Sequence, residues 1–318
     1  MEQLPSTFAQ TVARVKTFVL PEIDREAATK QLYYHTRAHI SGVQHRANII
    51  FQAIAPYWQA SPADKATSDY LARMQLLLEL CAVAHDMVQI FIPQTQPHTS
   101  RRREAGVSET LTVQKLLDYI QRLNQQLQEH GVDDSARFTD ADLSLIQEAI
   151  AATICTYDPS EQAIYQPALY DSDRPLSTVA IILALADIGS LGMEGIAAYN
   201  REGSLLFLEE NPDVIPILLN LEIGALASEN FNLYENIRQR LLKRACFQVN
   251  FAKSRLHRYV REISALPGDA TLILTRDVFQ YLKPSTIQKI ESTTPTDADT
   301  PLEKLVDFFK LNEYIANG

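Results

Sequence analysis

Residues 71–88 read LARMQLLLELCAVAHDMV, and this stretch decides the fold. Apolar side chains recur at positions 71, 74, 77, 78 and 81, the three- and four-residue spacing of one buried helical face. Pro62 is a favourable initiation residue for such a helix, and Pro93 lies beyond its end. We therefore expect a helix from about Ala63 to Val88.

The rest of the chain has the same helical character. Leu, Ala, Gln, Glu and Arg recur at helical spacing, and only 10 glycines are spread over 318 residues, which disfavours a sandwich, a barrel or a doubly wound sheet. The sequence therefore predicts an all-α protein, with an irregular segment from Tyr157 to Pro175. Further helices are expected over about 6–30, interrupted or ended by Pro21, and over 36–50, 104–129, 139–155, 176–193 and 213–263.

Length and a modest change of character after Gly203 predict two parts. Residues 1–203 are expected to form a catalytic helical domain, and residues 204–318 a helical C-terminal extension without a chemical motif of its own. The extension would either cover the pocket or form a dimer surface, so self-association into a homo-oligomer stays open.

Charge and cysteine content limit the partners. The net charge of −10 would repel a polyphosphate, so a long nucleic acid is not expected, whereas a small phosphorylated molecule can be drawn to a bound metal ion.

The cysteines bear on the compartment: Cys81, Cys155 and Cys246 are odd in number and lie among apolar residues, which indicates a reducing compartment. The first residues lack a signal-peptide pattern, and the longest apolar run, Val179 to Ala186, is short of a membrane span. We expect a cytoplasmic protein with no membrane partner.

Three elements place titratable groups on helices. His35 and His39 are four residues apart and would share one helical face, although an isolated pair at this spacing is more often structural or exposed. His85 and Asp86 interrupt an apolar helical surface, where burial without a partner is costly. Asp187 is a lone carboxylate at the end of another apolar run. Each group alone could be an ordinary hydrogen-bonded core residue.

Together these elements supply imidazoles and carboxylates from separate helices. Such a mixed nitrogen and oxygen set suits an octahedral divalent metal ion with water in its open positions. A closed structural zinc site would instead favour cysteines. The sequence therefore predicts a metal centre of the catalytic type.

The order of a His, a His-Asp pair and a distant Asp resembles the signature of the HD superfamily of metal-dependent phosphohydrolases, over residues 30–195. The first motif, Tyr34-His35 followed by His39, is similar to that of cyclic-nucleotide phosphodiesterases and of predicted bacterial HD phosphohydrolases. The bacterial group is the closer one, because Glu104 and Ser108 fall at about the place of its Glu and Ser motif. The resemblance implies an HD-domain-like helical bundle.

The resemblance also implies roles for residues. His39, His85, Asp86 and Asp187 match the ligands of one or two divalent ions, whether Mn, Mg, Fe, Zn, Co or Ni, with Asp86 as the bridge between two ions and so a catalytic residue. His35 matches the histidine that protonates the leaving oxygen in the phosphodiesterase branch. Elementary chemistry agrees, because a divalent ion lowers the pKa of bound water and an imidazole that titrates near pH 7 can deliver a proton.

One departure concerns the substrate phosphate. Many HD hydrolases carry a lysine three residues after the Asp, where this chain has Gln89. Arg101, Arg102 and Arg103 are candidates to replace it, since guanidinium groups bind phosphate through paired hydrogen bonds. The alternative is a solvated basic turn before a helix. We expect Gln89, the three arginines and Glu104 at the substrate.

Three functions follow from these patterns. The first is hydrolysis of a phosphoester bond in a small, nucleotide-like substrate by a metal-activated water. The second is a regulatory HD module that binds a nucleotide without turnover, although such modules usually lose metal ligands and this chain keeps all four. The third is a di-iron HD-type oxygenase, which would need further histidines, and His98 is the only nearby candidate.

Overall fold

The computed structural model describes residues 4–61, 64–65, 68–220 and 223–316. Helices dominate this part of the chain, which confirms the predicted all-α fold. In the described ranges the strands form two short antiparallel pairs, β1 (Gln59–Ser61) with β2 (Asp64–Lys65) and β3 (Thr156–Asp158) with β4 (Ala163–Tyr165). The second pair lies in the segment that was expected to be irregular.

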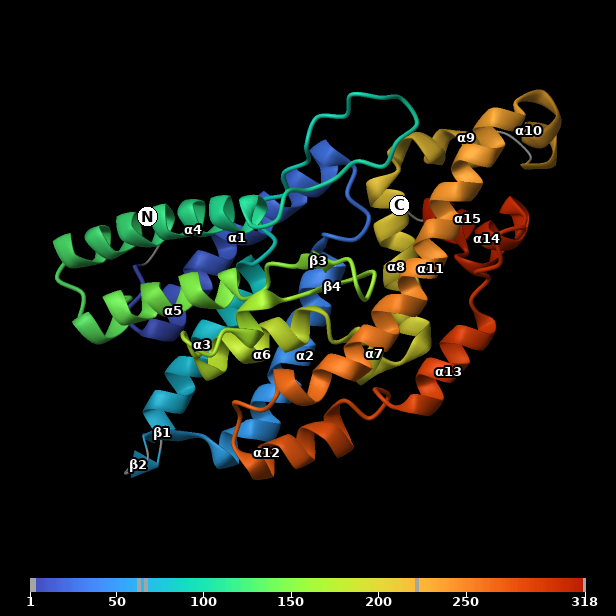
Figure 1. Ribbon diagram of the computed structural model, residues 1–318. Coiled ribbons are helices and arrows are strands. Elements are labelled where there is room, and N and C mark those ends of the chain that lie inside the picture. Colours follow the sequence, from blue (N-terminus) through green and yellow to red (C-terminus); the bar gives the residue numbers. More distant parts are fainter. Residues whose placement is uncertain (1–3, 62–63, 66–67, 221–222, 317–318) are drawn as a thin grey trace.

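Six helices form the first half of the fold (Figure 1). They are α1 (Phe8–Lys30), α2 (Arg37–Ile54), α3 (Ser68–Ala84), α4 (Val107–Glu129), α5 (Asp140–Ala151) and α6 (Thr178–Asp187). α2 packs against both α3 and α6, and α3 and α6 are almost entirely apolar along their buried faces. Burial of these apolar side chains is the main stabilising contribution to the bundle.

The remaining helices belong to the second half of the chain, and α11 is the longest of them. They are α7 (Ser190–Glu194), α8 (Ile196–Glu210), α9 (Ile215–Asn220), α10 (Ile223–Glu229), α11 (Phe231–Glu262), α12 (Gly268–Ile273), α13 (Pro284–Thr293), α14 (Leu302–Phe308) and α15 (Leu311–Ala316). Part of this region builds a second apolar core, which includes Phe207, Leu241, Leu305 and Phe309. α8 is continuous across the expected domain boundary between residues 203 and 204.

The structure corrects the expectation at Pro21. Helix α1 continues through this proline, which lies on the exposed side. Val15, Val19 and Ile23 are buried on the opposite face, and their packing maintains the helix where the proline removes one backbone hydrogen bond. Tertiary burial therefore outweighs the local preference.

Two helix ends also differ from the expectation, and both position the site. α3 begins at Ser68 and ends at Ala84, so His85 and Asp86 follow its last turn instead of lying within a helix that reaches Val88. The helix expected over 176–193 is divided into α6 and α7. At the break, a Cβ on Gly189 would lie 2.7 Å from the carbonyl oxygen of Leu185, which is too close for a carbon atom. Glycine has no Cβ and therefore fits this position without a shift of the backbone.

Candidate metal centre

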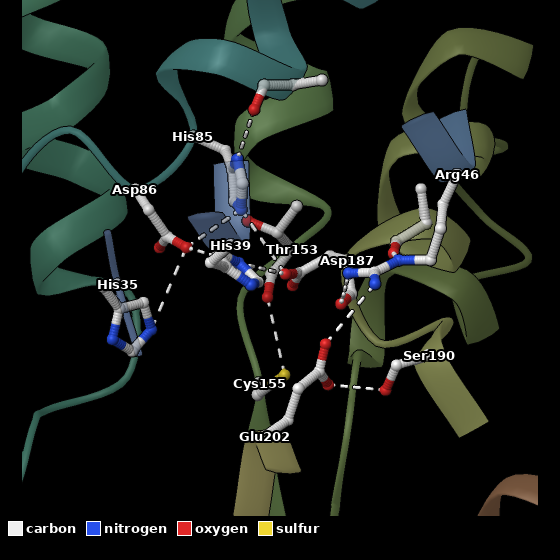
Figure 2. A network of polar contacts seen from close by, with 12 residues as sticks. His35, His39, Arg46, His85, Asp86, Thr153, Cys155, Asp187, Ser190 and Glu202 are labelled. Carbon is white, nitrogen blue, oxygen red and sulfur yellow. Dashed lines mark hydrogen bonds and ion pairs between the residues drawn. The ribbon is translucent and has the colours of Figure 1, made fainter. Parts of the chain in front are cut away.

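Three helices bring four predicted ligands together. His39 comes from the first turn of α2, His85 and Asp86 follow α3, and Asp187 is the last residue of α6. One ligand atom from each residue lies within 4.8 Å of the others, so the cluster can hold a metal ion. Figure 2 shows these side chains pointing toward one another.

The carboxylates and imidazoles are interleaved. Nε2 of His39 lies 3.1 Å and Nε2 of His85 lies 3.0 Å from Oδ2 of Asp86. Each of these nitrogens is also 3.4 Å from Oδ1 of Asp187. Two oxygens and two nitrogens therefore surround one small volume, as the ligands of a single cation do.

Hydrogen bonding supports this interpretation. Nδ1 of His85 is 3.0 Å from the carbonyl oxygen of Ala82. Because a carbonyl oxygen only accepts, Nδ1 carries the proton, and the lone pair of Nε2 is available to a metal ion. Among the described residues, Nε2 of His85 and both ring nitrogens of His39 are buried without a hydrogen-bond partner. An unsatisfied buried polar group costs about 1 to 3 kcal/mol, and a cation bound by these nitrogens would remove that cost.

The charges of the cluster depend on one another. Burial disfavours ionised Asp86, but the charges of His85 and His35 and the close approach of the His39 and His85 rings hold the pKa of Asp86 well below its usual range. Burial also opposes protonation of His39, yet Asp187 and Asp86 raise the pKa of His39 above its ordinary value. The two carboxylates thus require nearby positive charge, which either imidazolium protons or a divalent ion can provide.

His35 lies beside this cluster and is held by a residue that the sequence did not indicate. Nδ1 of His35 lies 2.5 Å from Oε1 of Glu209, and Oε2 of Glu209 accepts backbone hydrogen bonds from Tyr34 and His35 at 2.9 and 3.0 Å. The other ring nitrogen, Nε2, is 3.9 Å from Oδ2 of Asp86. Figure 2 shows Asp86 between His35 and the two ligand histidines.

The environment keeps Glu209 ionised. Burial alone would raise the pKa of Glu209, but the charge of His35, the hydrogen bonds from His35 and the charge of Arg103 hold it at about 2. Glu209 belongs to α8, in the region that was expected to lack chemistry. The available signal was a carboxylate directly after the apolar run from Leu205 to Leu208, which is the same pattern that marked Asp187.

The three consecutive arginines have different surroundings. Nη1 of Arg103 lies 3.0 Å from Nε2 of His35 and 2.5 Å from Oε1 of Gln89, so this guanidinium reaches the candidate site. Arg101 instead donates to the backbone carbonyls of Lys30, Gln31 and Glu209. Arg102 is exposed, and its backbone pairs with Ile92.

Other predicted positions are distributed as follows. Gln89 is buried and donates from Nε2 to Oδ1 of Asp86 at 3.0 Å, which places it beside the ligands. Glu104 is exposed, and Oγ of Ser108 accepts a hydrogen bond from the backbone N–H of Ile90. His98 is exposed, lies 3.3 Å from Asp213 and is not part of the four-residue cluster.

Comparisons with known proteins do not assign this chain to a family. No family model, no curated protein and no solved structure matches it. Within the described ranges, none of the helices combines the length and the apolar character that crossing a membrane requires. The chemistry of the site therefore has to be inferred from its own geometry.

Proposed function

We propose that this chain is an HD-type phosphohydrolase that uses a divalent metal ion to hydrolyse a phosphoester bond in a small, nucleotide-like substrate. The observation that carries the proposal is the position of His35, held by Glu209, at the edge of the four-ligand cluster. A metal site alone would also suit a binding module. A buried His and Glu pair beside it provides a group that can deliver a proton to a leaving oxygen.

The ligands would be His39, His85, Asp86 and Asp187. A divalent ion bound there would activate water and neutralise charge on the phosphoryl oxygens. The choice among Mn, Mg, Fe, Zn, Co and Ni stays open, because nitrogen and carboxylate ligands accept all of these ions. The small ligand set and the net charge of −10 argue for a small substrate in preference to a long nucleic acid.

Proton delivery by His35 favours an ester over an anhydride as the substrate. When water attacks phosphorus and the bond to an alcohol breaks, the departing alkoxide is strongly basic and needs a proton. Glu209 holds Nδ1 of His35, and Nε2 lies 3.9 Å from Oδ2 of Asp86 and 3.0 Å from Nη1 of Arg103. Arg103 would therefore have to turn from Nε2 to the phosphate when substrate binds, which would free Nε2 to deliver the proton to the leaving oxygen. A pyrophosphate leaving group is far less basic and would gain little from this arrangement.

We assign Arg103 to the phosphate, and we assign Gln89 to the positioning of Arg103 and Asp86, because both ends of its buried amide contact these two residues. Arg103 and Gln89 both contact groups of the site, and the guanidinium of Arg103 can donate paired hydrogen bonds to phosphoryl oxygens. Arg101 is engaged by three backbone carbonyls and is better suited to hold the loop. Arg103 is distinguished from Arg102 and Glu104 by its contacts with His35 and Gln89, so the expected roles of Arg102 and Glu104 at the substrate have no comparable support.

The test is a screen of phosphomonoesters, phosphodiesters and nucleoside triphosphates with Mn²⁺ or Mg²⁺ added to the purified protein. We expect release of phosphate or a nucleoside from an ester, and loss of both metal binding and activity in His39→Ala and Asp86→Ala. His45→Ala is a matched control, because His45 is an exposed histidine of the same helix α2. A silent wild type that binds nucleotides would favour the regulatory module, and about two irons per chain with oxygen consumption would favour the oxygenase.

A further inference from the structure

Arg46 is a buried cation that the proposed reaction does not use. Its side chain is 2% exposed, and it is among the largest fully buried side chains of the protein. A guanidinium so far from water must be compensated by hydrogen bonds and negative charge. Figure 2 shows Arg46 next to Asp187, on the side of the candidate metal centre away from His35 and Asp86.

The guanidinium binds the end of α6. Nε of Arg46 donates to the carbonyl oxygen of Ala186 at 2.7 Å, and Nη2 donates to the carbonyl oxygen of Asp187 at 3.4 Å. These are the last carbonyls of the helix, which have no partner within it and carry the negative end of its dipole. Arg46 therefore fixes the backbone of the residue that contributes a predicted ligand.

Two glutamates hold the guanidinium in place. Nη1 of Arg46 lies 3.0 Å from Oε1 of Glu194 and 3.4 Å from Oε1 of Glu202. Glu202 is itself oriented by Ser190, whose hydroxyl donates to Oε2 of Glu202 at 2.5 Å. The network joins α2 to α7 and α8 immediately after α6 ends.

His39 and Arg46 are on the same helix and contact the same residue. They are seven positions apart in α2, two helical turns, so both face α6. Nε2 of His39 is 3.4 Å from the carboxylate of Asp187, and Arg46 contacts the backbone carbonyl of that residue. α2 thus holds Asp187 by its side chain and by its main chain.

We propose that Arg46 is a positioning residue that sets the carboxylate of Asp187 for metal binding. The inference rests on the proposed metal centre but adds a residue that touches neither the ion nor the substrate. Contacts of this kind, one step behind a ligand, typically change metal affinity about 10- to 100-fold when removed. Lysine cannot replace arginine here, because one ammonium group cannot reach two carbonyls and two carboxylates in a fixed plane.

The experiment is a double-mutant cycle on metal affinity. Mn²⁺ binding would be measured by the electron paramagnetic resonance signal of the free ion, for the wild type, Arg46→Lys, Asp187→Asn and the double variant. Arg255→Lys is the matched control, because Arg255 is equally buried and is paired with Glu262 within α11. The free energy of unfolding of the metal-free proteins would be measured in parallel.

We expect Arg46→Lys to weaken Mn²⁺ binding about tenfold and Arg255→Lys to leave it unchanged. Asp187→Asn should weaken binding more, and adding Arg46→Lys to it should cause no further loss, because Arg46 acts through Asp187. Wild-type affinity in Arg46→Lys, or a full further tenfold loss in the double variant, would overturn the proposal while leaving the metal centre intact.

Two more measurements separate the possible failures. If Arg46→Lys does not fold, Glu202→Gln removes one of the charges that hold the guanidinium, and it should weaken Mn²⁺ binding about threefold, within the scale of such indirect contacts. Unchanged binding in Glu202→Gln would then count against the proposal. Absence of Mn²⁺ binding by the wild type would overturn the metal centre itself and with it the proposed function.

Discussion

Glu209 and His35 are 174 positions apart in the sequence, yet Oε1 of Glu209 lies 2.5 Å from Nδ1 of His35 and both side chains are buried. The carboxylate fixes the orientation of the ring by its contact with Nδ1 and by the hydrogen bonds that it accepts from the backbone of Tyr34 and His35. The pair defines how the proposed proton transfer can be tested.

The first prediction concerns the leaving group. Glu209→Gln should lower kcat on an alkyl phosphoester about 100-fold, the lower limit of general acid catalysis. It should have little effect on a p-nitrophenyl ester, because p-nitrophenolate departs without a proton. Steady-state kinetics on the two esters gives the comparison, and an equal loss on both would show that the pair does not serve proton transfer.

The second prediction concerns stability against acid. Because the pKa of Glu209 is about 2 in the folded protein and near 4.5 in an unfolded chain, its ionisation contributes about 3 kcal/mol above pH 4.5. This contribution is lost as the pH falls from 4.5 toward 2. Urea unfolding of the wild type and Glu209→Gln should therefore differ most near pH 6, and a difference that grows below pH 4.5 would contradict the assignment.

The third prediction compares the same substitution at the three adjacent arginines, which should change KM, the free energy of unfolding or neither. Arg103→Met should raise KM about tenfold, a loss of about 1.4 kcal/mol that one charge-assisted hydrogen bond to phosphate can account for. Arg102→Met should leave kinetics and stability unchanged. Arg101→Met should instead reduce the free energy of unfolding by about 1 to 3 kcal/mol, since it leaves backbone carbonyls without a donor.

The fourth prediction concerns the metal ion and stability. Protein treated with a chelator should gain about 2.7 kcal/mol when Mn²⁺ is added at 100 times its Kd, which for this chain length raises Tm by about 4 °C. His85→Ala should show no such increase, because His85 is one of the four residues of the cluster that can hold the ion. Differential scanning fluorimetry can make both measurements, and an equal increase in the two proteins would place the ion elsewhere.

The fifth prediction concerns the break between α6 and α7. An added Cβ at Gly189 would lie 2.7 Å from the carbonyl oxygen of Leu185 and 3.2 Å from that of Ala186, so Gly189→Ala should destabilise the fold by about 1 to 3 kcal/mol. Gly268→Ala is the control, because an added Cβ there meets no atom within 4 Å. Chemical denaturation of both variants tests the difference.

The sequence predicted the helical fold and the four residues of the candidate metal cluster because both depend on local patterns. His85, Asp86 and Asp187 each follow a run of apolar residues, and a polar side chain in such a place needs a partner. Their convergence required only that the helices pack, and α2 packs against both α3 and α6. The proposed enzymatic function stays a prediction.

Other features could not be predicted because they depend on tertiary contacts. Arg101 and Arg103 are two residues apart, and only the path of the loop decides which of them reaches His35. The helix through Pro21 is stabilised by burial of its opposite face. Glu209, like Asp187, is a carboxylate directly after an apolar run. The residues next to it in the sequence do not indicate that it pairs with a histidine 174 positions earlier.

The continuity of α8 across residues 203 and 204 has a practical consequence for any attempt to isolate the smallest active fragment. A protein that ends at residue 203 would keep the four residues of the candidate metal centre but would lose Glu209, the partner of His35. Such a fragment would also lose Val249, Phe251 and Tyr259, which belong to the same apolar core as the buried faces of α2, α3 and α6, so we expect it not to fold on its own. The structural unit that holds the candidate site therefore includes α8 and the later helices that complete the shared core, and a fragment intended to keep the site has to contain them.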